Sequence, residues 1–274
     1  MEDYDLISDL HSDQTNWTIR CKVLKKWHVK HPRERPSLQF MLMDEEGETI
    51  QAYLYITDLI KAFDKTIEEG EWISISEFVV FDETSDEPNS PIGSCIRFLN
   101  NTEVDHIDPI EFDIAQGFVS FSDVLGGKTE PGIPIDILGF VIKIDPLVTV
   151  NDDSYPERQD KKTASISFTI KDHKGLLLSC IALGPHAIDF NDKIFSENQL
   201  LFVVILTDWS VKQREDEYYI RSRGGISRIE FHPDCPRAKT LVRRFWNTQN
   251  KPTNVIDLGC NDDEASPSSV KPRN

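Results

Sequence analysis

The sequence contains no long hydrophobic run. Its longest uninterrupted apolar stretch is seven residues, 200–206, whereas a membrane-spanning helix needs about 20. The amino terminus is acidic, where a secretion signal would be basic. We therefore expect that the protein has no signal peptide and does not bind a membrane.

Cysteine is scarce as well, with five residues scattered along the chain. None of them forms a CxxC pair or a cluster with histidine, so we expect neither a structural zinc site nor a disulfide framework. Reduced thiols in an intracellular compartment fit this pattern best. We predict that the protein uses no metal ion and no other cofactor.

The sequence also lacks the common catalytic motifs. It has no GxxxxGK[ST] phosphate loop, no HExxH zinc motif and no GxSxG nucleophile elbow. Its seven histidines are not spaced as metal ligands. The sequence therefore predicts a protein that is not an enzyme.

Positive charge is in short supply. There are 30 Lys and Arg residues against 47 Asp and Glu, which gives a formal net charge of −17. A chain this acidic cannot coat nucleic acid by bulk charge, so any nucleic-acid site has to be local. Most of the deficit lies in residues 1–129, which carry 11 basic and 26 acidic side chains.

An internal repeat is the most informative feature that is present. The segment Phe40-Met-Leu-Met-Asp44-Glu-Glu-Gly47 recurs at 168–175 as Phe, Asp and Gly with the same spacing, 128 residues further on. Each copy alternates apolar residues, ends in Asp-x-x-Gly and runs into a second apolar stretch. This pattern predicts a hairpin in which Asp opens the turn and Gly supplies a positive φ.

The same series of elements surrounds each hairpin. A long strand precedes it, a short helix follows it, and two more strands complete the unit. The expected ranges are 17–27, 57–63, 72–81 and 94–99 in the first unit, and 133–144, 185–190, 200–209 and 218–223 in the second. Five strands with one helix between the third and the fourth are typical of the OB-fold, so we predict an all-β protein of two tandem five-stranded Greek-key barrels.

The composition between these elements predicts the domain boundaries. The first barrel is expected over residues 6–105, a linker over 106–132, and the second barrel with a C-terminal helix over 133–247. That helix is expected to start near Pro236 with Asp234 as its cap. Residues 248–274 are rich in Pro, Asn, Asp and Ser, and we expect a disordered tail.

A local basic cluster interrupts the acidic first half. Between residues 20 and 35 there are seven basic side chains against one acidic one, with Trp27 and two histidines among them. The cluster covers the end of the first strand and the loop to the second, which in OB-folds is one jaw of the ligand groove. Basic groups there would follow phosphates while aromatic rings stack on bases. The alternative, that these are solvated loop charges, stays open.

Several segments carry a family resemblance, in the right order over about residues 6–247. They are residues 16–23, 44–47, 50–52, Lys61 and Phe63 in the first barrel, 118–121, 134–139, 172–175 and 184–190 in the second, and 226–229, 233–236 and the closing helix to Trp246. The segments of the barrels resemble the two central DNA-binding barrels of the replication protein A large subunit. The end of the chain resembles plant-type relatives of that subunit.

The resemblance implies non-catalytic binding of single-stranded DNA through both barrels, in DNA replication, recombination or repair in the nucleus. RNA binding stays open, and other replication or repair proteins are possible partners. The aromatic position on strand three is Tyr55 in the first barrel and Leu183, which cannot stack, in the second. The other nucleic-acid-binding residues implied are Lys25, Lys26, Arg33, Arg35, Phe81, Trp209, Lys212 and Arg214, with Trp27 either a loop platform or strand-end packing.

A second function from another class is also compatible with the sequence. The pair of barrels would be an acidic protein-interaction scaffold or transcriptional accessory that has lost strong nucleic-acid binding, since OB-folds also bind proteins. The docking and zinc-bearing barrels of the family's large subunit fit neither the length nor the cysteines of this sequence. We therefore expect a stand-alone member and leave its oligomeric state open.

Overall fold

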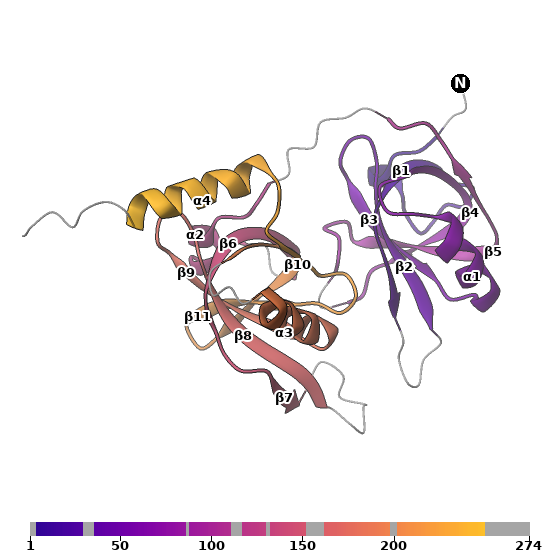
Figure 1. Cartoon of the computed structure of the whole chain (residues 1–274). Helices are drawn as coiled ribbons and strands as arrows, with labels where there is room; N and C mark the ends of the chain where they lie inside the picture. Colours follow the sequence, from indigo (N-terminus) through magenta and orange to yellow (C-terminus); the bar gives the residue numbers. More distant parts are fainter. Residues whose placement is uncertain are drawn as a thin grey trace, which may run out of the picture.

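Two β-rich units lie side by side, with the N-terminal unit shown in purple and the C-terminal unit in pink and orange (Figure 1). The computed structural model describes residues 4–29, 36–85, 88–110, 117–129, 132–151, 162–197 and 202–249. Within this part of the chain no helix is long and apolar enough to cross a membrane.

The first unit is a closed five-stranded barrel with strand order β1-β2-β3-β5-β4. Alternate side chains of each strand point into the barrel. Apolar residues therefore recur with a period of two, and this period predicted the strands. Its elements are η1 (Ile7–Asp9), β1 (Thr18–Val29), β2 (Ser37–Met43), β3 (Thr49–Leu54), α1 (Thr57–Thr66), β4 (Trp72–Asp82) and β5 (Ser94–His106).

The second unit repeats this topology in the order β6-β8-β9-β11-β10, and the pairing of β10 with β6 joins the two ends of that path. The predicted fold class of tandem five-stranded barrels is confirmed. Two short strands that the sequence did not predict, β7 and β12, pair with β8 and β10. The elements are β6 (Pro134–Ile144), β7 (Val148–Asn151), β8 (Lys162–Lys171), β9 (Leu177–Leu183), α3 (Pro185–Glu197), β10 (Phe202–Arg214), β11 (Glu217–Ser222) and β12 (Arg228–Phe231).

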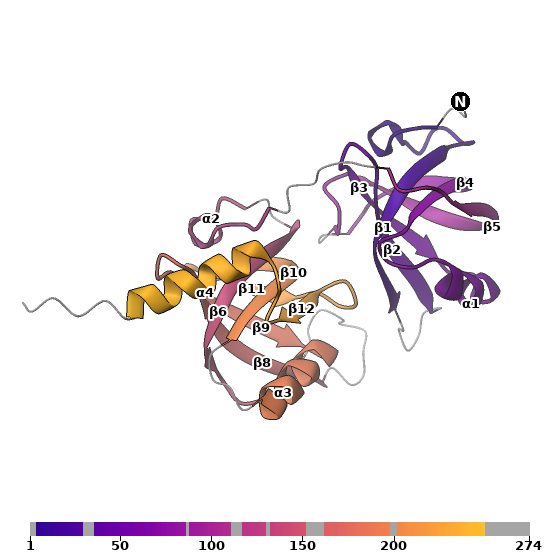
Figure 2. The same ribbon diagram turned by 45° about the horizontal axis from the view of Figure 1, so that its top comes forward.

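Two further helices belong to the second barrel. Phe121 and Val124 of α2 (Phe121–Leu125) are buried in its core, so this part of the predicted linker belongs to the second barrel. Helix α4 (Pro236–Gln249) lies across β6 and β10, where Leu241 packs against Phe140 and Val203 (Figure 2). The predicted tail beyond residue 249 lies outside the described residues.

The cap of α4 differs from the prediction. The Cys235 sulfur accepts a hydrogen bond from the Ala238 N–H at 3.4 Å, so Cys235 caps the helix. Asp234 instead forms an ion pair with Lys239, which lowers the pKa of Asp234. A carboxylate one residue too early cannot reach the first free N–H groups of the helix.

The turn between β2 and β3 is organised by a buried carboxylate. Asp44 is 1% exposed and accepts hydrogen bonds from the backbone N–H groups of Ile7 at 2.9 Å, Glu46 at 3.1 Å and Glu48 at 3.0 Å. Two of these bonds close the turn itself. The bond from Ile7 ties the N-terminal 3-10 turn to the end of the barrel, 37 residues away.

The repeated turn in the second barrel keeps the local part of this arrangement. Asp172 accepts from the N–H groups of Lys174 and Leu176, both at 2.8 Å. Gly47 and Gly175 occupy the same place in the two turns with φ of +89° and +93°. The prediction that Asp opens each turn and Gly supplies the positive φ is confirmed.

Candidate nucleic-acid interface

An aromatic cluster lies on the outer face of the first barrel. The Tyr53 ring stacks on the Tyr55 ring, with centroids 6.0 Å apart and planes 6° apart. The Phe81 ring lies 5.7 Å from that of Tyr53, and the Arg97 guanidinium lies 4.9 Å over Phe81. We call these four side chains, Tyr53, Tyr55, Phe81 and Arg97, the first-barrel platform.

Strand register brings the platform together. Tyr53 of β3 pairs with Arg97 of β5, and Phe81 of β4 pairs with Cys95, the outward residue two positions before Arg97. Tyr55 follows β3 directly and is 38% exposed, so its ring is accessible. The structure thus joins two predicted residues, Tyr55 and Phe81, through Tyr53 and Arg97, which sequence reasoning missed.

A carboxylate flanks the platform. The Tyr53 hydroxyl lies 3.4 Å from Glu83 Oε2, and the Cys95 sulfur lies 3.0 Å from the same oxygen. Burial, reinforced by the Glu83 charge, raises the pKa of both Tyr53 and Cys95 above their usual ranges. The phenol and the thiol therefore stay neutral. The platform offers uncharged ring faces, one cation at Arg97 and one neighbouring anion at Glu83.

Lys26 has a structural role instead of the predicted phosphate contact. Its ammonium donates hydrogen bonds to the backbone carbonyls of Asp64 at 2.7 Å and Ile67 at 2.8 Å. These carbonyls belong to the last turn of α1, where a lysine neutralises the negative end of the helix. The Lys26 side chain is thereby held on the first barrel.

Lys25 is a contact between the two barrels. Its ammonium forms an ion pair with Asp208 and donates to the Thr207 hydroxyl at 2.9 Å, both on β10. Burial lowers its pKa to about 8, and the nearby Asp136 acts in the opposite direction. A lysine committed to these partners cannot at the same time follow phosphates, so its predicted role is replaced.

Trp27 is strand-end packing, one of the two alternatives that the sequence left open. Its side chain is 6% exposed and packs with Met41 and Ile226. Gly225 lies against its ring so closely that a Cβ there would be 2.6 Å from Trp27 Cδ1. A covered ring cannot act as a loop platform. Arg33 and Arg35, the other basic groups predicted for the first barrel, lie outside the described residues.

The contact between the barrels has two more anchors. The Arg228 guanidinium donates to the Lys26 carbonyl at 3.2 Å and pairs with Glu69 at 3.3 Å. The Arg223 guanidinium donates to the carbonyls of Pro88 at 3.0 Å and Gly132 at 3.1 Å. Together with Lys25, Trp27, Met41, Thr207, Asp208, Gly225 and Ile226, these residues form what we call the inter-barrel contact.

Trp209 is a core residue, and the prediction that it stacks on a base is wrong. Its side chain is fully buried. It follows Asp208, a bulge residue with φ of +56°, as Phe78 follows Glu77 in the first barrel, which also has φ of +56°. The bulge turns the next side chain inward in both barrels, so Trp209 corresponds to the buried Phe78.

The outer face of the second barrel carries a different set. Lys212 pairs in register with Tyr219 of β11, and the Arg214 guanidinium lies 5.9 Å from the Tyr219 ring. Tyr219 was missed by sequence reasoning because it lies on strand five, away from the expected loop. In place of an aromatic ring at the end of strand three, this face has Leu183, which is half-buried.

We expect a substitution at Leu183 to strengthen binding of single-stranded DNA. Replacing it with tyrosine should tighten binding of oligo-dT by about 10-fold, because one base–aromatic stack is worth about 1–3 kcal/mol. Fluorescence anisotropy with a labelled oligonucleotide measures the change. Ile188→Tyr adds the same ring at an exposed site on α3 and is the control. Equal gains in both variants would contradict the assignment of this outer face as a binding surface.

The comparisons with known proteins agree with this architecture. Residues 8–127 match the family model described as a domain of unknown function, DUF223. Replication factor A protein 1 from Schizosaccharomyces pombe is 28% identical over 191 residues, covering 68% of this chain and 30% of the relative. A chain from a replication protein A heterotrimer bound to ssDNA matches with a TM-score of 0.63 at 17% identity, covering 89% of this chain and 55% of that one.

The fold therefore defines a tandem OB-fold protein, built from two barrels of the same topology. Within that class the chain is similar in sequence to Replication factor A protein 1, in agreement with the resemblance drawn from its sequence. It spans less than a third of the curated relative and about half of the solved chain. Among the described residues no group of His, Cys, Asp or Glu is arranged to hold a metal ion.

Proposed function

We propose that the protein binds single-stranded DNA without catalysis, and that the first-barrel platform is the main contact. The observation that carries this proposal is the accessible Tyr55 ring, stacked on Tyr53 and backed by Phe81 under the Arg97 guanidinium. The likeness to a replication protein A heterotrimer bound to ssDNA supports it. By that likeness, the protein acts in DNA replication, recombination or repair in the nucleus.

The chemistry of the platform suits an unpaired strand. Every base has a π-face, so stacking on Tyr55 tolerates any sequence, and Arg97 supplies a cation for a neighbouring phosphate. Stacking is worth about 1–3 kcal/mol per base, a range measured on single-strand-binding proteins that include replication protein A itself. Because Lys25 and Lys26 are engaged elsewhere, we expect few phosphate contacts and a shallow dependence of affinity on salt.

The Tyr55→Ala variant tests the proposal. Its affinity for a labelled oligo-dT of about 20–30 nucleotides should fall about 10- to 100-fold in fluorescence anisotropy, since one stacking ring is lost. Phe195→Ala removes an aromatic ring that is 78% exposed on α3 of the second barrel, and should leave the affinity unchanged. Repeating the titration at two salt concentrations gives the number of phosphate contacts.

The scaffold hypothesis is the second candidate, and a specific observation favours it. Lys25, Lys26 and Trp27, three residues of the predicted binding cluster, are used in contacts within the protein. If oligo-dT does not bind, or if Tyr55→Ala and Phe195→Ala weaken its binding equally, the platform is not a DNA site and the scaffold function replaces it. An oligo-U competitor in the same assay compares RNA with DNA.

A further inference from the structure

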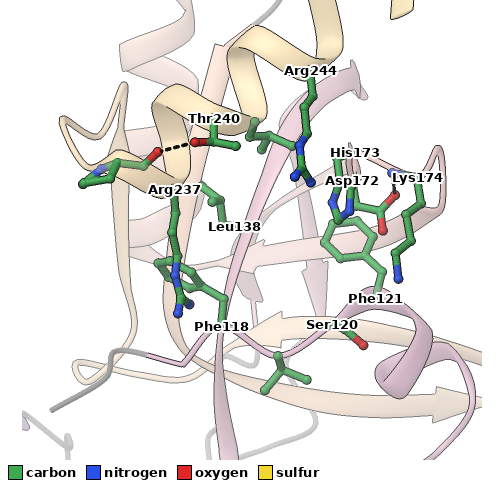
Figure 3. Close-up of a pocket in the computed structure, with 13 residues that line it drawn as sticks. Phe118, Ser120, Phe121, Leu138, Asp172, His173, Lys174, Arg237, Thr240 and Arg244 are labelled. Atoms are coloured by element: carbon green, nitrogen blue, oxygen red, sulfur yellow. Dashed lines mark hydrogen bonds between the residues drawn. The ribbon is translucent and has the colours of Figure 1, made fainter.

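A cavity of about 410 Å³ lies on the second barrel, away from the first-barrel platform. Four parts of the chain enclose it: the start of α4, strand β6, the turn between β8 and β9, and the segment that leads into α2 (Figure 3). Its lining residues are Phe118, Val119, Ser120, Phe121, Leu138, Asp172, His173, Lys174, Pro236, Arg237, Thr240, Leu241 and Arg244.

The floor of the cavity is apolar. Phe121 and Leu241 are buried, and Leu138 and Phe118 are half-buried beside them. These side chains offer no hydrogen-bonding group to an occupant. A space of this size and chemistry accepts one or two apolar side chains.

The rim, in contrast, is cationic. Arg237 and Arg244 project from α4 on one side, and Lys174 lies across from them on the turn (Figure 3). The Arg237 guanidinium lies 5.5 Å over the Phe118 ring, which holds it at the mouth. Among the lining residues Asp172 is the one carboxylate, so the mouth of the cavity carries more positive than negative charge.

We propose that this cavity docks a short acidic segment of a partner protein, with an aromatic or leucine side chain as its anchor. The anchor fills the apolar floor, and carboxylates on either side of it meet Arg237, Arg244 and Lys174. Charge complementarity selects this occupant, because these cations gather at one mouth on a chain whose net charge is −17. Arginine guanidinium groups also match carboxylates in geometry.

A nucleic-acid strand fits the cavity less well. The Arg237 guanidinium lies 5.5 Å over the Phe118 ring, so a base that stacked on this face of the ring would have to displace it. Leu138 and Leu241 cannot read the polar edges of a base. The cavity also belongs to the α4 side of the second barrel, whereas the platform is built on β3, β4 and β5 of the first.

A random 12-residue peptide library displayed on phage and selected on the full chain tests the proposal. The enriched peptides should combine Phe, Trp or Leu with Asp and Glu. The resynthesised lead peptide should bind at least 10-fold more weakly to Arg237→Glu/Arg244→Glu, and to Thr240→Trp, which fills the cavity. Lys239→Glu/Arg243→Glu makes the same charge change on α4 outside the cavity and should bind as the unaltered chain does.

Three results would overturn the proposal. The first is a selection without enrichment, and the second is a lead that binds all variants equally while circular dichroism shows that they are folded. The third is a loss of oligo-dT binding in Arg237→Glu/Arg244→Glu as large as in Tyr55→Ala, which would assign the cavity to the path of the strand. Peptide binding that persists in Tyr55→Ala separates this proposal from the proposed DNA-binding function.

Discussion

Replacing Asp44 with alanine is expected to lower the free energy of unfolding of the first barrel by about 3–5 kcal/mol. The carboxylate accepts three backbone N–H groups in a buried setting, and each donor left without a partner costs about 1–3 kcal/mol. Loss of the bond from Ile7 also frees the N-terminal 3-10 turn from the end of the barrel. Urea denaturation followed by circular dichroism measures the change.

The internal repeat supplies a matched control for this prediction. Asp172→Ala makes the same substitution in the second barrel, where the carboxylate accepts two N–H groups of its own turn at a more exposed position. Its cost should be about 1 kcal/mol, because water can reach the freed donors. Equal losses in the two variants would mean that the bond to Ile7 contributes nothing.

The Gly225→Val variant should separate the two barrels. A Cβ at this position would lie 2.6 Å from Trp27 Cδ1 and 3.0 Å from Trp27 Cβ, so the loop between β11 and β12 has to withdraw. Overpacking of this kind costs about 1–3 kcal/mol. We expect a larger radius of gyration in small-angle X-ray scattering and a red shift of tryptophan emission as Trp27 becomes wet.

The neighbouring glycine is the control for that experiment. An added Cβ at Gly224 meets no atom within 4 Å, so Gly224→Val changes the same loop without touching Trp27. The scattering and the emission of Gly224→Val should match those of the unaltered chain. If Gly225→Val also matches, the Trp27 packing does not hold the barrels together.

Local patterns predicted the fold well. The alternation of apolar residues and the Asp-x-x-Gly turns are properties of short segments, and a short segment determines whether it forms a strand or a tight turn. The same alternation places Tyr53 on the outer face with Tyr55, so Tyr53 could have been found. The sequence offset of 128 also pairs Phe81 with position 209, and this failed because the offset at the two bulges is 131 residues (208 − 77), which pairs Trp209 with Phe78.

The roles of the basic cluster could not be read in the same way. Lys25 bonds to Thr207, 182 residues away, and no local pattern indicates which surface will cover a loop. A run of basic residues on an expected ligand loop has the same sequence pattern whether its side chains contact phosphates or the neighbouring domain. The same holds for Lys26 at shorter range, since the sequence does not indicate that its side chain bonds to the end of α1.

The inter-barrel contact gives the molecule a fixed geometry. Ion pairs, a buried tryptophan and guanidinium bonds to backbone carbonyls join the barrels along one seam. The span from Tyr55 to Tyr219 is thus set by side-chain packing and is independent of the length of the connecting chain. A ligand long enough to reach both rings should therefore occupy a length that this contact sets.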